Sequence, residues 1–144
     1  MKVARFVLSL LIPASVVITS AACSNPLSDL FGSPSSPSNN TSTDTFSGSL
    51  APSGSLIFTF PVATAGNVAV TLTAVSPAAT GPLALGMGPS SNGTCTIATS
   101  TGGATAGANP QLSATENPGN YCVQVSDPGS LTTTSTVTVT VAHP

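Results

Sequence analysis

Thr136-Val137-Thr138-Val139-Thr140-Val141 alternates a β-branched apolar residue with a β-branched hydroxyl residue without interruption. Successive side chains of a strand point to opposite faces, so a period of two is typical of a strand with one buried face and one face in water. Valine and threonine also favour extended backbone. The stretch therefore predicts a half-buried strand with Val137, Val139 and Val141 inside.

The same period recurs at four earlier places in the chain. The residues predicted to face inward there are Leu56, Phe58 and Phe60; Val68, Val70 and Leu72, with Thr71 and Thr73 outward; Leu83, Leu85 and Met87; and Tyr121, Val123 and Val125. Turn-forming sequences lie between them, namely Pro52-Ser53-Gly54, Ala65-Gly66-Asn67, Asn92-Gly93, Asn117-Pro118-Gly119 and Asp127-Pro128-Gly129. No helical apolar stripe interrupts the pattern. We therefore predict an all-β domain at residues 46–144, an antiparallel β-sandwich of the jelly-roll or immunoglobulin-like kind.

The stretch Thr99–Pro110 departs from this spacing of short loops. It consists of small residues and has no charged, aromatic or imidazole side chain. Long loops in compact domains are usually functional or mobile. Since this one carries no chemistry, we expect a mobile loop.

Residues 24–45 have a different composition from the domain that follows. Ser, Pro, Asn, Thr and Gly dominate, and large apolar side chains are few. Such a segment buries too little surface to offset the entropy lost on ordering. Together with Cys23, it is predicted to be a disordered tether spanning residues 23–45.

The first 22 residues have the pattern of an export signal. Lys2 and Arg5 precede an apolar stretch at 6–18, and small residues follow it. The apolar stretch is shorter than the roughly 20 residues of a membrane-spanning helix. Residues 1–22 are therefore predicted to be a signal peptide removed on export.

Thr19-Ser20-Ala21-Ala22-Cys23 resembles the lipobox of bacterial lipoproteins, although Ser20 stands where that family usually has Leu. The resemblance implies that the Cys23 thiol receives diacylglycerol and fatty acyl groups such as palmitate, which anchor the protein to the cell envelope. Ser24 follows in place of the Asp that marks inner-membrane retention, which implies the outer membrane in a Gram-negative cell. Ordinary cleavage after Ala22, giving a fully secreted protein, is the alternative.

Three cysteines leave one without a partner in an exported chain. If Cys23 carries lipid, Cys95 and Cys122 remain as a pair in an oxidising compartment. The loop of roughly 28 residues that they close would contribute about 3–4 kcal/mol. A metal site is the other interpretation, but the chain has no CxxC motif and a single His. We expect a disulfide and no metal.

The stretch 117–129 (NPGNYCVQVSDPG), followed by the strand that opens this section, resembles the end of bacterial pre-peptidase C-terminal domains. Phe58-Thr59-Phe60 and Gly66-Asn67-Val68 also fit. That resemblance implies a fold similar to jelly-roll carbohydrate-binding modules. Some relatives bind calcium through clustered acidic residues, whereas this domain offers only Glu116 and Asp127, so calcium is not expected.

Composition argues against several functions. Residues 23–144 contain four acidic residues and no Lys or Arg, which excludes nucleic acid as a partner. Glu116 and Asp127 flank the Tyr121 strand, so we expect them far apart rather than as a catalytic pair. His143 is expected to be an exposed terminal residue. Tyr121 is expected in the core with its hydroxyl at the rim. No catalytic residue and no cofactor is predicted.

The sequence thus predicts a non-catalytic cell-envelope lipoprotein with one β-sandwich module for structure or interaction. Its expected partners are the membrane, through the lipid, and an envelope protein or glycan. A secreted glycan- or peptide-binding module is the alternative. Stacking platforms for sugars are usually Trp or Tyr, and the chain has no Trp and one Tyr.

Overall fold

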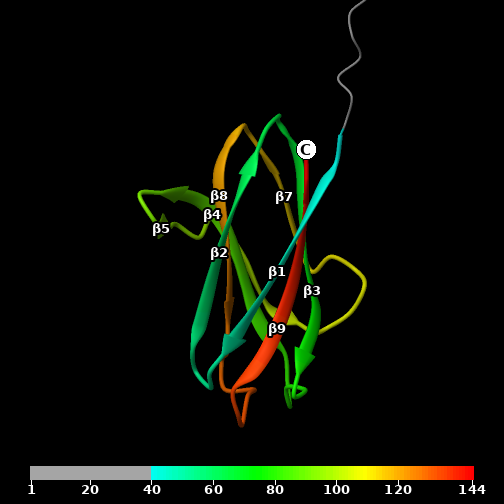
Figure 1. Cartoon of the computed structure of the whole chain (residues 1–144), viewed down its shortest axis with the longest axis vertical. Coiled ribbons are helices and arrows are strands. Elements are labelled where there is room, and N and C mark those ends of the chain that lie inside the picture. The colour runs from blue at the N-terminus through cyan, green and yellow to red at the C-terminus, as the bar shows by residue number, and fades with distance from the viewer. Residues whose placement is uncertain (1–39) are drawn as a thin grey trace, which may run out of the picture. The chain divides into compact units, whose positions relative to one another are not determined.

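A computed structural model describes residues 40–144, which form strands and, within that range, no helix long and apolar enough to cross a membrane (Figure 1). The strands are β1 (Ser42–Leu50), β2 (Ser55–Val62), β3 (Gly66–Ser76), β4 (Leu83–Ser91), β5 (Thr94–Cys95), β6 (Thr99–Ala104), β7 (Leu112–Glu116), β8 (Gly119–Ser126) and β9 (Ser135–His143). The predicted all-β class is confirmed.

The strands pair into two sheets, and every pairing is antiparallel. One sheet has the order β1-β9-β3-β7. In the other, β2 pairs with β8 and β8 with β4, while β5 and β6 both pair with β4. The two sheets face each other as the layers of a sandwich (Figure 1). The predicted antiparallel β-sandwich is therefore correct.

The core between the sheets contains the residues that the alternation placed inside. Val137, Val139 and Val141 of β9 are fully buried, and so are Val68, Val70 and Leu72 of β3. Leu83, Leu85, Met87, Tyr121, Val123 and Val125 are buried in the facing sheet. A period of two thus identified the inner faces of β2, β3, β4, β8 and β9, whereas the nine-residue strand β1 was not predicted.

Thr71 differs from the prediction, because this outward residue of β3 is 7% exposed. The backbone N–H of Gln111 donates to Val70 O, and that of Gly107 donates to Leu72 O. The segment before β7 therefore runs beside β3 and is hydrogen-bonded to Val70 and Leu72, the residues that precede and follow Thr71. The alternation cannot reveal this, since the segment comes from elsewhere in the chain.

The first strand begins inside the range predicted to be tether. β1 starts at Ser42, and Asp44 lies opposite Val141 in the ladder with β9. Residues 42–45 are ordered because the end of β9 offers them backbone partners, although their composition is that of a linker. The predicted signal peptide, Cys23 and the part of the tether up to residue 39 lie outside the described residues.

The stretch 99–110, expected to be a mobile loop, is half strand. Its first part is β6, which pairs with β4 from Met87 to Leu83. The remainder is tied to β3, since the Leu72 N–H donates to Gln111 Oε1 at 2.7 Å and Gln111 Nε2 donates to Thr105 O at 3.0 Å. The lack of charged, aromatic and imidazole side chains predicted mobility, but the backbone of this stretch is held by neighbouring strands.

Candidate functional site

Asp127 is buried at the turn after β8, where its carboxylate organises the backbone. Oδ1 accepts hydrogen bonds from the backbone amides of Gly129, Ser130 and Leu131, and Oδ2 accepts one from Ser53. Burial raises the pKa of Asp127, but the amide of Ser53 and the three amides of its own turn outweigh burial and hold the pKa below 3.8. All these donors are backbone groups of the fold, so this carboxylate has a structural role.

His143 lies in the core and not at an exposed end, which corrects the prediction. It continues the inward row of β9 after Val141, and it is only 5% exposed. Its Nε2 lies 3.2 Å from Asp44 Oδ2, and its ring centroid lies 5.4 Å from that of Phe60. The pairing of β1 with β9, which the sequence did not predict, protects the ring from solvent.

The environment of His143 does not resemble a hydrolase triad. Within residues 40–144 its hydrogen-bond partner is Asp44, and Nδ1 is buried without a partner. A triad would place a nucleophile's hydroxyl on the second nitrogen. The Asp44–His143 pair therefore joins β1 to β9.

Tyr121 is buried in β8 with its hydroxyl at the rim, as predicted. The hydroxyl donates to Asn117 O at 3.0 Å. Burial raises the pKa of Tyr121, nearby Glu116 raises it further, and the contact with the Asn117 backbone lowers it. Glu116 ends β7 and Asp127 follows β8, so the two carboxylates lie near opposite ends of β8. The structure therefore does not bring them together, in agreement with the expected separation.

Aromatic side chains do not form an exposed platform in the described domain. Phe60 and Tyr121 are buried with ring centroids 6.1 Å apart. Phe46 and Phe58 stack on each other at 5.2 Å and are partly buried against the core. The large apolar side chains that remain exposed among residues 40–144 are Ile57 and Ile97.

The disulfide between Cys95 and Cys122 is present, with their Cα atoms 5.7 Å apart. Cys122 points to the outer face of its sheet, opposite to Tyr121 and Val123, yet it is fully buried. The segment 96–98 crosses this outer face. Its backbone N–H groups at Thr96 and Ala98 donate to carbonyls of β4. The disulfide fastens this crossing to β8.

Gly86 and Gly88 make the crossing possible, and the sequence analysis missed them. A Cβ on Gly88 would overlap the Thr96 carbonyl oxygen, and one on Gly86 would lie 3.0 Å from the Ile97 side chain. Both glycines face outward on β4, where close approach of another backbone requires a residue without a side chain. The spacing Gly-x-Gly inside an alternating strand was the available signal.

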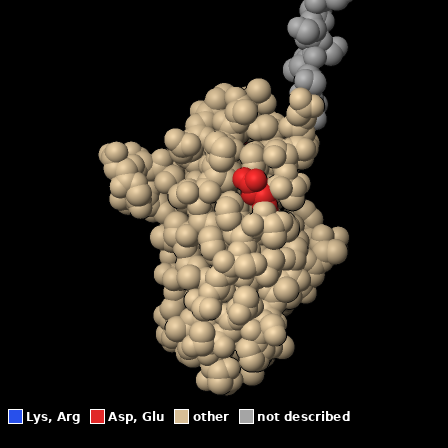
Figure 2. All heavy atoms as spheres, viewed as in Figure 1, with Lys and Arg blue, Asp and Glu red and all other residues tan. Residues whose placement is uncertain are grey.

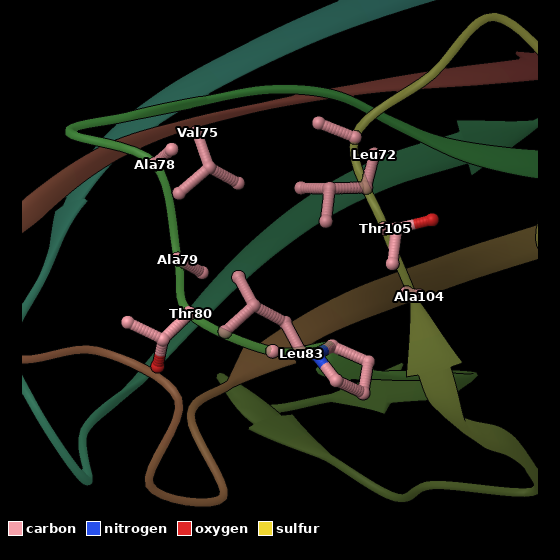
Figure 3. A pocket seen from close by; sticks show the side chains of 11 residues that line it. Leu72, Val75, Ala78, Ala79, Thr80, Leu83, Ala104 and Thr105 are labelled. Carbon is pink, nitrogen blue, oxygen red and sulfur yellow. The ribbon is translucent and has the colours of Figure 1, made fainter.

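The described domain also has an apolar cavity of about 310 Å³ at one end of the sandwich. Leu72 and Val75 of β3 lie on one side of it, and Leu83 of β4 and Ala104 of β6 lie on the other (Figure 3). The loop 78–82 and residues Thr105 and Ala106 complete the lining. None of the lining residues carries a charge, so the cavity is suited to apolar groups.

Two other hollows have mixed linings. One of about 400 Å³ contains Thr59, Ser90, Asn92 and Asn120, and one of about 330 Å³ contains Thr41, Asn67 and Pro144. The face in Figure 2 shows a small acidic patch and no basic side chain. No group of three or more His, Cys, Asp or Glu within the described range is close enough to hold a metal ion.

No protein-family model matches this chain, and no curated protein matches it in sequence. Its function therefore has to be argued from its own residues.

Proposed function

We propose that this protein is a non-catalytic lipoprotein of the bacterial cell envelope, anchored through Cys23, with its β-sandwich serving as an interaction module. In a Gram-negative cell the proposed location is the outer membrane. The observation that carries the proposal is that titratable side chains of the domain make their hydrogen bonds to other groups of the fold.

Each of these groups is occupied by a structural contact. The Asp127 carboxylate binds backbone amides, His143 pairs with Asp44, and the Tyr121 hydroxyl donates to Asn117. General acid–base or nucleophilic catalysis requires such groups to converge on a site that a substrate can reach. Their dispersal favours binding over catalysis.

The anchor proposal rests on the N-terminal sequence. The lipobox-like run ends at Cys23, and the first strand begins at Ser42. A fully extended chain between these residues would span about 60 Å. Two or more acyl chains on one cysteine hold a protein on a bilayer firmly, whereas one chain binds only marginally. The sandwich would then be presented near the membrane.

Intact mass of the protein from membrane and medium fractions tests this proposal. We expect a mass beginning at Cys23 with added acyl groups in the membrane fraction, and no alkylation of Cys95 or Cys122 until a reductant is added. Cys23→Ser is the matched control and should remove the acyl mass. An unmodified chain in the medium with a free thiol at Cys23 would refute the anchor.

The alternative of a secreted glycan-binding module has less support. Sugar platforms rely on exposed aromatic faces, whereas Phe60 and Tyr121 are buried and the rings of Phe46 and Phe58 stack on each other. A pull-down on peptidoglycan that survives salt and detergent would favour this alternative.

A further inference from the structure

The apolar cavity lies where one sheet is incomplete at its edge. β7 pairs with β3 only from Gly66 to Val70, whereas β3 continues to Ser76. Beyond Val70 the neighbour of β3 is the segment before β7, held by Gly107 N–H to Leu72 O at 2.9 Å. On the edge of β3 opposite to β9, no strand therefore lies beside Val75. The cavity occupies this opening between the two sheets.

The cavity exists because its walls are built from small side chains. Its floor is Leu72, Leu83 and Ala104, each at most 1% exposed. Alanine and glycine form much of the remaining wall, with Ala78 and Ala106 at the exposed rim. Apolar atoms that line an empty space lose dispersion contacts on that side. An aliphatic group placed there would restore those contacts and leave water at the same time.

Polar atoms at the cavity are directed elsewhere. Thr80 Oγ1 donates to Ser130 O at 2.7 Å, and the Thr80 backbone N–H donates to the same oxygen at 2.9 Å. In Figure 3 the hydroxyl oxygens of Thr80 and Thr105 point away from the space between Val75 and Leu83. The cavity therefore offers little hydrogen bonding to a polar ligand.

The lack of basic side chains in the domain narrows the class of apolar ligand further. Both basic residues of the chain, Lys2 and Arg5, lie in the predicted signal peptide, so the domain has no Lys or Arg to pair with a carboxylate or phosphate. The nearest turn carries Asp127, which is bonded to the Ser130 amide. An anionic amphiphile would meet no countercharge at the mouth of the cavity.

We propose that this cavity binds one neutral aliphatic chain, such as the alkyl chain of an uncharged lipid or a long-chain alcohol. Its volume of about 310 Å³ is at the lower end of the range for small-molecule sites, which matches a single chain. The inference goes beyond the proposed function and does not depend on the anchor.

A series of n-alkanols from butanol to decanol tests the proposal on residues 23–144 with Cys23→Ser and the disulfide formed. Amide chemical shifts should change at 75–83 and 104–106. Affinity should rise about fourfold with each added methylene until the cavity is full. Octanoate at neutral pH should bind at least tenfold more weakly than octanol. Shifts centred on Phe46 and Phe58, no dependence on chain length, or equal affinity for octanoate would overturn the proposal.

Rim variants locate the site. Ala78→Trp should weaken octanol binding at least tenfold by filling the mouth, and Ala106→Trp should do the same from the other side. Ala63→Trp is the matched control, because Ala63 is also an exposed alanine and lines none of the cavities. If both rim variants fold and bind octanol like the parent, the cavity is not the binding site. A failed anchor would appear only in the mass experiment, not here.

Discussion

The outer faces of the two sheets differ in their exposure to solvent, although their strands follow the same alternation. On the β1-β9-β3-β7 sheet the outward row is mostly Ser and Thr, such as Ser47 and Thr138, whose hydroxyls lie 3.0 Å apart in a solvent-exposed contact. On the other sheet the outward residues are covered: Gly88 lies against the backbone of Thr96 and Ala98, Cys122 is bonded to Cys95, and both are buried. Alternation thus distinguishes the two faces of a strand but does not say whether the outer face meets water.

The two outer faces are also stabilised by different kinds of contact. The hydroxyl face contributes single hydrogen bonds between neighbouring strands, for example Thr73 Oγ1 donating to Thr138 O at 3.1 Å. The covered face adds a covalent disulfide and a close backbone contact between Gly88 and Thr96. Changes on the covered face should therefore cost much more stability than changes on the hydroxyl face.

Gly88→Ala should have the largest effect. The new Cβ would overlap the Thr96 carbonyl, so the crossing segment must lift away and take Cys95 with it. The overpacking cost then adds to the loss of the disulfide, and unfolding should become easier by about 4 kcal/mol or more. Chemical denaturation measures the loss, and alkylation without reductant should reveal free thiols.

Gly102→Ala is the matched control, because nothing lies within 4 Å of a Cβ at that position. It should be neutral or slightly stabilising. Equal stability of the two alanine variants would show that the 96–98 segment does not press on β4.

Replacing Cys95 and Cys122 together by Ser should come next. The chain-entropy model gives a loss of about 3–4 kcal/mol for a loop of this length. The double variant and the reduced parent should have similar unfolding midpoints in denaturant, both well below that of the oxidised parent. An unchanged midpoint in the double variant would contradict a stabilising crosslink.

Asp127→Asn should destabilise the domain in a manner that depends on pH. The pKa of Asp127 is lowered in the folded state, so its contribution to stability is fully present above the ordinary value of 3.8 and is lost as the pH falls through the lowered folded pKa. The gap in unfolding free energy between parent and variant should therefore be widest near neutral pH and close in acid. A gap that stays constant to low pH would contradict the proposed role of the amide contacts.

Asp44→Asn tests the carboxylate in β1 of the other sheet, for comparison with Asp127→Asn. Asp44 is 40% exposed at the side chain, and its side-chain hydrogen-bond partner within residues 40–144 is His143. A partly exposed polar contact of this kind contributes at most about 1 kcal/mol. A loss as large as that of Asp127→Asn would mean that the His143 contact carries more of the fold than its exposure indicates.

Thr136→Val should have the smallest effect. Thr136 is exposed on the hydroxyl face of β9, and valine fits a strand equally well. The free energy of unfolding should change by no more than about 0.5 kcal/mol. A thermal melt that moves by many degrees would show that this face is covered in solution.

Prediction from the sequence succeeded where the information is local. Val137, Val139 and Val141 are buried as expected, because side-chain direction along a strand depends only on position. The Cys95–Cys122 pair followed from counting cysteines in a chain predicted to be exported. The expectation for His143 failed, because its burial requires β1 beside β9, and β1 begins within a stretch that looks like linker.

The apolar cavity also could not be predicted from the sequence. It needs β7 to end its pairing at Val70 while β3 continues, and it needs the small residues of 78–82 and 104–106 to meet β3 at one edge. For Gly88 the Gly-x-Gly spacing signals a close approach of another backbone, but only the structure identifies Thr96 as the residue that approaches.

The amino-acid sequence by itself therefore determined the fold class, the inward faces of β2, β3, β4, β8 and β9, and the partners in the disulfide. Only the tertiary structure decided which outer face is covered, where the first strand begins, that His143 is buried and that a cavity remains. The physical reason is the range of the interactions: alternation and turn chemistry act between neighbours in the chain, whereas covering, pairing and cavities depend on which distant segments pack together.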